Sequence, residues 1–153
     1  MATVHCTISK PQAEVFAALV NPETYPHWLV GARVIRSIDD AWPAIGAAFH
    51  HRVGLIGPVT VADRTVVVAI DAPNMLELEV MARPFGRGKV RFELAERAGD
   101  EGRETLLTFD EVPLGLLSPS RMVLNPIVTL RNEVSLGQLR DYLLTGKSHR
   151  GPA

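Results

Sequence analysis

The sequence of 153 residues has little of several features that mark particular protein classes. It has one cysteine, Cys6, so no disulfide can form within the chain, and a reducing compartment is the simpler interpretation. Its formal net charge is −1, which gives no overall electrostatic case for binding nucleic acid or an acidic membrane surface. No apolar run approaches the roughly 20 residues of a membrane-spanning helix, and residues 1–10 do not resemble a signal peptide. We therefore expect a cytoplasmic monomer or homodimer with no nucleic-acid partner and no integral membrane segment.

Metal-binding and catalytic motifs are also missing. The sequence contains no HExxH, CxxC or GxSxG motif. His50 and His51 are neighbours in a predicted strand, so their side chains point to opposite faces and cannot easily share one ion. The GRGK at 86–89 lacks the glycine and the Ser/Thr of a phosphate-binding loop, and a strand follows it. The sequence therefore predicts no metal and no cofactor.

The composition and the first 30 residues predict one domain that begins with a strand and two short helices. Hydrophobic residues make up 46% of the chain and charged residues 22%, which is an ordinary globular composition. Residues 3–8 are largely β-branched and predict a strand. Ser9 has the capping-box spacing to Gln12 and predicts the start of a helix. Asn21, followed by proline, predicts the start of a second short helix over 22–29.

From residue 33 onward, the apolar residues recur with the period of strands. Short connections rich in turn residues separate the segments, which favours antiparallel neighbours because a parallel pair needs a long crossover. The 59–70 strand is apolar on both sides, so its inward face stays open and a bulge is allowed. With the first strand, the sequence predicts about seven strands. The six later segments are 34–38, 47–53, 59–70, 75–82, 89–96 and 104–112.

The last third of the chain predicts a long closing helix over about 119–145, ended by Gly146. Pro126 would disturb a helix interior, so we expect a break or kink near residue 125. The apolar stripe shifts along this helix, so that one half could face a cavity while the other packs on the small helices. Residues 147–153 are expected to fray, which leaves 1–146 as the domain. The two stripes are Ile127, Leu130 and Val134, and then Leu136, Leu139 and Leu143.

Strand alternation sorts the strand side chains into an inward and an outward face. Segments 75–82 and 89–96 are expected to form a hairpin with apolar residues inward and opposite charges paired across its outer face. His51 and Glu111 stand among apolar inward positions, where burial is costly without a partner. Either they anchor a polar group of a ligand or exchange protons with it, or they reach water or a backbone group at a strand end.

Five segments, taken in this order, form the pattern of a known superfamily. They are ISKPQAEVFAALVNPETYPHW, AAFHHRVG, DAPNMLELEVMARPFGRGKVRFEL, ETLLTFDEVPLG and RNEVSLGQLRDYL. The chain resembles, over about residues 3–145, the START/Bet v 1-like (SRPBCC) superfamily and, within it, the polyketide cyclase/dehydrase-like branch. The resemblance implies an α+β helix-grip fold, in which a curved antiparallel sheet of about seven strands wraps around a long C-terminal helix. Two short helices follow the first strand, and a mainly apolar cavity lies between sheet and helix.

The resemblance also implies a function, with alternatives that stay open. Superfamily members bind lipids, sterols, plant hormones and polyketides, and a minority catalyse cyclisation or dehydration. We therefore expect a small hydrophobic ligand, lipid- or polyketide-like, in the cavity. The alternatives are an aromatase/cyclase- or dehydratase-like enzyme, with His51 and Glu111 as catalytic candidates, and a module that modulates a protein partner. Segments 54–57 and 84–88 could gate the cavity or be plain hairpin turns. The expected ligand-binding residues are Trp28, Phe49, His51, Leu78, Phe92, Phe109, Glu111, Ile127, Leu130 and Val134.

Overall fold

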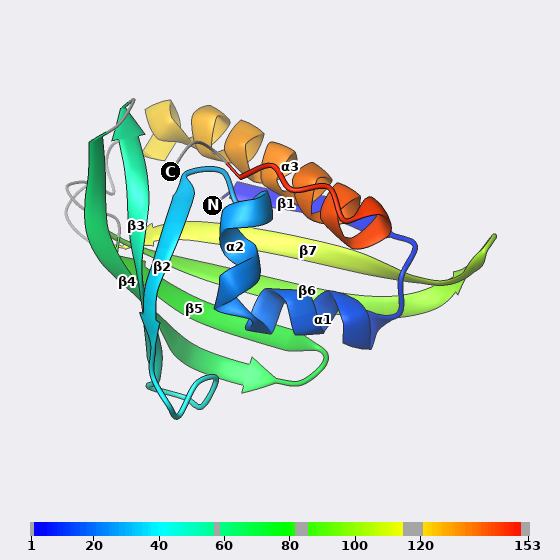
Figure 1. The fold of residues 1–153 in the computed structure, drawn as a ribbon. Helices are drawn as coiled ribbons and strands as arrows, with labels where there is room; N and C mark the ends of the chain where they lie inside the picture. The colour runs from blue at the N-terminus through cyan, green and yellow to red at the C-terminus, as the bar shows by residue number, and fades with distance from the viewer. Residues whose placement is uncertain (1, 57–58, 82–85, 115–120, 151–153) are drawn as a thin grey trace.

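The computed structural model describes residues 2–56, 59–81, 86–114 and 121–150. Its elements follow the predicted order: a strand, short helices, a run of strands and one long helix (Figure 1). They are β1 (Ala2–Ile8), α1 (Gln12–Val20), the 3-10 helix η1 (Pro22–Thr24), α2 (Tyr25–Trp28), β2 (Ala32–Ile38), β3 (Ala48–Ile56), β4 (Val59–Asp71), β5 (Met75–Met81), β6 (Arg87–Gly99), β7 (Gly102–Leu114) and α3 (Arg121–Thr145).

The strands form one antiparallel sheet in the order β1-β7-β6-β5-β4-β3-β2. Strands β2 to β7 pair with their neighbours along the chain, and β1 returns to pair with β7. The sheet is strongly curved, α3 runs along β1 across the open side of the curve, and α1 and α2 lie in front of β6 and β7 (Figure 1). This is the predicted helix-grip fold of class α+β. None of the helices in the described part of the chain is both long and apolar enough to cross a membrane.

The core fills the inner face of the sheet and its contact with the helices. Strand alternation places one row of side chains from each strand inside, and the helices add a second layer. The largest fully buried side chains are Trp28, Phe49, Phe92, Phe109, Ile8, Leu19, Leu76, Leu78, Leu107, Leu136, Leu139 and Val15. Because four of these are aromatic, much of the space between sheet and α3 is occupied by the protein itself.

The sheet departs from regular pairing at several positions. In β4 the register with β5 shifts between Val67 and Ala69, and the extra residue, Val68, is 40% exposed. This confirms the bulge that the apolar character of both sides of the strand allowed. Strand β2, at the sheet edge, has two register shifts against β3, between Ala32 and Val34 and between Ile35 and Ser37.

The β5–β6 hairpin carries the predicted charge pairs on its outer face. Glu77 lies 3.4 Å from Lys89 and 3.5 Å from Arg91, and Glu79 lies 3.1 Å from Arg87. The basic residues here are balanced by carboxylates, which argues against a phosphate site, and one of these carboxylates, Glu77, is buried.

Helix α1 is capped differently from the prediction. Its N-cap residue is Pro11, no side chain of that residue caps the helix, and the backbone N–H of Gln12 donates to Glu96 Oε2 on β6 at 2.8 Å. The capping box from Ser9 was therefore wrong, because a carboxylate from the sheet takes the position that the Ser9 hydroxyl would need. This bond and one from Arg103 hold the pKa of Glu96 below its ordinary value.

A break or kink was predicted near residue 125. Helix α3 is continuous from Arg121 to Thr145, with Pro126 inside it, so the helix is not broken there. Pro126 is the sixth residue of the helix, where its missing N–H removes only a bond to the first turn. Gly146, at φ +72°, ends the helix, and its N–H donates to Tyr142 O at 2.9 Å. Residues 151–153 lie outside the described residues, and before them His149 N–H donates to His27 O beside Trp28 of α2 at 2.8 Å, so this part of the tail is held.

Candidate ligand-binding site

A cavity of about 120 Å³ lies between the inner face of the sheet, the loop before β2 and helix α3. Its wall is mostly apolar and comes from β2 to β7. Polar side chains enter the wall at two places: His51 with Thr65 on β3 and β4, and Glu111 with Arg131 on β7 and α3. An apolar cavity of about 150 Å³ is known to accept benzene, so this one is of the size of a single ring.

The structure gathers six of the predicted ligand-binding residues around this cavity. They come from β3, β5, β6 and β7, and each lies on the face of its strand that the alternation of side chains predicted to point inward. That they bind a ligand stays a prediction. The six are Phe49, His51, Leu78, Phe92, Phe109 and Glu111.

Trp28 does not line the cavity but belongs to the solid core beside it. It is 0% exposed, and its indole N–H donates to Thr24 Oγ1 at 3.1 Å. Its ring packs edge-on against Tyr25, with centroids 5.0 Å apart. Trp28 was predicted to line the cavity, whereas in the structure it packs within the solid core.

The three predicted residues of α3 also lie away from the cavity. Ile127, Leu130 and Val134 are 66%, 62% and 44% exposed. The helix turns its other side inward, where Asn132 and Ser135 are 0% exposed. The apolar stripe was therefore placed on the wrong side, because the inward side of the helix carries the polar residues Asn132 and Ser135.

His51 forms the first polar group of the wall. It is 6% exposed, its Nε2 hydrogen-bonds Thr65 Oγ1 at 3.0 Å, and its ring lies 5.3 Å from that of Phe49. Burial, with a smaller effect of His50, lowers the pKa of His51 from 6.5 to about 4. The imidazole is therefore neutral at pH 7 and has one nitrogen that can accept a proton.

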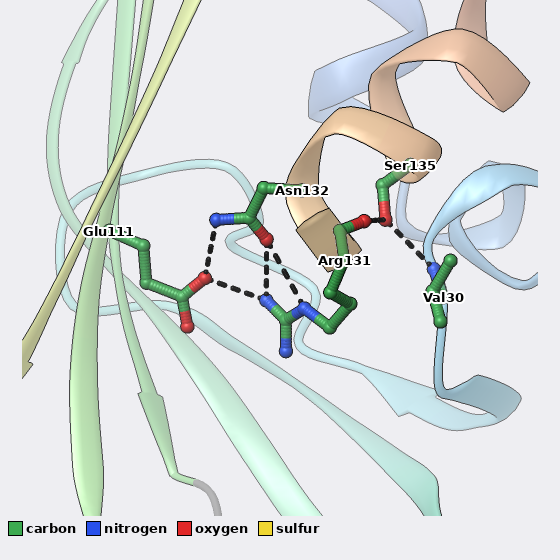
Figure 2. A network of polar contacts seen from close by, with 5 residues as sticks. All are labelled: Val30, Glu111, Arg131, Asn132 and Ser135. Carbon is green, nitrogen blue, oxygen red and sulfur yellow. Dashed lines mark hydrogen bonds and ion pairs between the residues drawn. The ribbon is translucent and has the colours of Figure 1, made fainter. Parts of the chain in front are cut away.

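Glu111, Arg131 and Asn132 form the second polar group (Figure 2). Arg131 Nη2 donates to Glu111 Oε2 at 2.6 Å, and Asn132 Nδ2 donates to the same oxygen at 2.9 Å. Asn132 Oδ1 in turn accepts from Arg131 Nη2 at 2.9 Å and Nε at 3.2 Å. The side chains of Glu111 and Arg131 are 19% and 37% exposed, so this group stands at the rim of the cavity.

Sequence reasoning found Glu111 but missed its two partners on α3. The available signal was Glu111 itself, because an inward carboxylate requires a partner of opposite charge. Arg131 and Asn132 are consecutive polar residues in the predicted closing helix. A search of that helix for the missing cation would have found Arg131.

Ser135 links the loop before β2 to α3. Its hydroxyl donates to Arg131 O at 2.8 Å and accepts from Val30 N–H at 3.1 Å (Figure 2). Val30 and its neighbours Leu29, Gly31 and Ala32 line the cavity. Of the two predicted gate segments, residues 57, 84 and 85 lie outside the described residues, while 54–56 belong to β3 and 87–88 to β6.

Within the part of the chain that the structure describes, no group of three or more His, Cys, Asp or Glu residues could hold a metal ion. His50, the neighbour of His51, instead lies 3.9 Å from Asp39 on the outer surface.

Comparison with known proteins gives similarity in structure alone. No family model matches the chain. No curated protein matches it either. DynU16, a protein of the dynemicin biosynthetic locus, is 21% identical with a TM-score of 0.68, over 98% of this chain and 49% of that one. Ara h 8.0201 is 16% identical with a TM-score of 0.65, over 94% and 96%. The di-domain ARO/CYC BexL of the BE-7585A biosynthetic pathway is 12% identical with a TM-score of 0.63, over 94% and 51%.

These similarities, with the curved seven-stranded sheet and the long closing helix, show that the chain shares the helix-grip fold of these proteins. At identities of 12% to 21% they establish the fold and leave the activity to be argued from the site.

Proposed function

We propose that this protein binds a small hydrophobic molecule between its sheet and α3. The observation that carries the proposal is the cavity of about 120 Å³ with a mainly apolar wall, into which the described residues bring polar groups at two places. Such a wall gains free energy from excluding water, and a few polar groups orient the guest. The helix-grip neighbours support a ligand-binding role by fold.

The size of the cavity limits the guest. Typical ligand pockets measure about 300–1,000 Å³, and the space here is smaller because Tyr25, Phe49, Phe92 and Phe109 occupy much of the interior. A single aromatic ring fits without rearrangement. A lipid- or polyketide-sized guest requires part of the wall to move. Among the described residues, one side-chain hydrogen bond holds the loop at residues 29–31 to Ser135 on α3.

Thermal unfolding with a panel of probes tests the proposal. Toluene, naphthalene, a medium-chain fatty acid and a polyketide-like polyphenol cover the size range. A guest at 100 times its dissociation constant adds about 2.7 kcal/mol to the free energy of unfolding, which raises Tm by roughly 5–11 °C in a domain of this size. The absence of any shift across the panel would refute the proposal.

A matched pair of variants tests whether the bound molecule occupies this cavity. Val90→Phe puts a ring into the cavity wall, whereas Val68→Phe makes the same change at the exposed bulge of β4. We expect Val90→Phe to abolish the thermal shift and Val68→Phe to retain it. Overpacking itself costs about 1–3 kcal/mol, so each variant is compared with and without the probe.

A second candidate is an enzyme resembling an aromatase/cyclase, and His51 is the observation that favours it. A neutral imidazole beside the cavity could accept a proton from a bound polyketide-like substrate. Incubation with a poly-β-ketone thioester mimic, followed by mass spectrometry for loss of water, tests this. His51→Gln should stop turnover and His50→Gln, on the outer face, should not. Equal turnover in both variants would exclude His51 as the base.

A further inference from the structure

The ion pair at the cavity rim uses only part of its hydrogen-bonding capacity. Among the described residues, both hydrogen bonds to the Glu111 side chain end on Oε2, and those from the Arg131 side chain start from Nη2 and Nε. No hydrogen bond among the described residues engages Glu111 Oε1 or Arg131 Nη1. Figure 2 shows these two atoms on the same side of the pair, away from Asn132. One acceptor and one donor are therefore presented together at the cavity rim.

Gly88 leaves space beside the acceptor. It lines the cavity from β6, and a Cβ added there would lie 3.9 Å from Glu111 Oε1 and 3.8 Å from Val112 O. Those are ordinary van der Waals distances, so the backbone would tolerate a methyl group. With glycine at this position, the space next to Oε1 stays open to a guest.

The charges of the wall favour an uncharged guest. Glu111 and Arg131 compensate one another at 2.6 Å, and His51 is neutral at pH 7. An anion entering the cavity would lose its hydration and meet no net positive charge. A hydroxyl group suits the two atoms, because it donates through its hydrogen and accepts through its oxygen.

We propose that Glu111 Oε1 and Arg131 Nη1, beside Gly88, form a recognition site for an uncharged hydroxyl group, phenolic or enolic, on the ring that occupies the cavity. This inference rests on the proposed function and specifies its ligand class. The hydroxyl donates to Glu111 and accepts from Arg131, while the ring lies against the apolar wall.

Calorimetry with three single-ring probes tests the inference: toluene, phenol and benzoate. Phenol and toluene are nearly equal in shape, so their difference reports the hydroxyl group. We expect phenol to bind the wild-type protein about fivefold more tightly than toluene, and benzoate to bind most weakly. In Glu111→Gln the preference for phenol should disappear, and benzoate should gain about fivefold because Arg131 is no longer compensated. Glu104→Gln makes the same change at an exposed ion pair with Arg97 and should leave all three affinities unchanged.

Gly88→Ala supplies a second variant, because its methyl group fits and the ion pair stays intact. It should weaken phenol binding at least about threefold more than toluene binding, as it occupies the space of the hydroxyl. Equal binding of phenol and toluene to the wild-type protein would overturn the hydroxyl site and leave the hydrophobic cavity standing. Tightest binding of benzoate would show an anion site instead. Failure of all three probes to bind would overturn both proposals.

Discussion

Shortening Leu78 to alanine should enlarge the cavity at a modest cost in stability. Leu78 is 2% exposed and lines the cavity from β5. Buried leucine-to-alanine changes cost about 2.7–5.0 kcal/mol, depending on the space left behind. Because one side of Leu78 already faces empty space, it has fewer van der Waals partners to lose. We expect a loss near 3 kcal/mol, at the lower end of that range.

Leu107→Ala is the matched control. Leu107 is 0% exposed, lies on the inner face of β7 and is packed into the solid core, away from the cavity wall. Its loss should cost about 4–5 kcal/mol. Urea unfolding of both variants measures the two free energies, and calorimetry with benzene and naphthalene measures the change in space.

Urea unfolding and calorimetry together test whether Leu78 borders space that a ligand can use. In Leu78→Ala, naphthalene should gain about tenfold or more over benzene, since the extra ring buries apolar surface that previously had no room. Leu107→Ala should show no such gain. Equal costs of unfolding in the two variants, together with unchanged affinity for naphthalene, would refute the view that Leu78 borders usable space.

Three further predictions concern His51, Glu96 and Ser135. Burial lowers the pKa of His51 from 6.5 to about 4, so between pH 6.5 and pH 4 the unfolded chain binds more protons than the folded one, and the free energy of unfolding falls by up to about 3 kcal/mol as the pH drops. Urea unfolding between pH 7 and pH 4 should show this pH dependence in the wild-type protein and lose it in His51→Gln. An unchanged pH dependence in the variant would contradict the assignment. The pKa of Glu96 is lowered from 4.5 in the folded protein, so the stabilisation by its carboxylate is complete above pH 4.5 and is lost as the pH falls toward the folded pKa. Glu96→Gln should therefore lower Tm at neutral pH and much less in strong acid. An equal loss of Tm at both pH values would contradict the bond from Gln12 N–H to the Glu96 carboxylate. Ser135→Ala should cost about 1 kcal/mol and speed hydrogen exchange of the Val30 amide, whereas a Val30 amide that stays protected would show that another bond holds the loop.

The inward residues of the strands were predictable because a strand has only two faces. Once Phe92 was assigned inward in 89–96, the alternation also determined that Arg91 and Glu93 point out, and the hairpin pairing followed. The same rule identified His51 and Glu111 as polar residues on the inner face. Strand alternation was therefore enough to predict that His51 and Glu111 lie at the site.

The closing helix was harder to interpret for a physical reason. A stripe such as Ile127, Leu130 and Val134 normally marks the buried side of a helix, because burial of apolar area dominates stability. Here the inward side carries Asn132 and Ser135, which are satisfied by bonds to Glu111 and to the loop before β2. These bonds join segments about 20 to 105 residues apart in sequence, so no local pattern reports them.

The role of Trp28 was unreadable for a related reason. Whether an aromatic ring borders a cavity or fills it depends on where its neighbours lie, and both positions bury similar apolar area. The size of the cavity is likewise the small remainder after several large side chains pack together. The volume of the cavity therefore follows only from the three-dimensional structure.

Strand β2 has a consequence for how copies of this protein meet. A sheet that ends in a straight, regular strand offers unpaired backbone groups on which a second sheet can extend. The last strand here is interrupted twice, after Ala32 and after Ile35, and the inserted residues are both arginines, Arg33 and Arg36. An irregular border does not continue a ladder of hydrogen bonds in register, which disfavours pairing between two such edges. Strand β2 is therefore a poor edge for the addition of a second sheet.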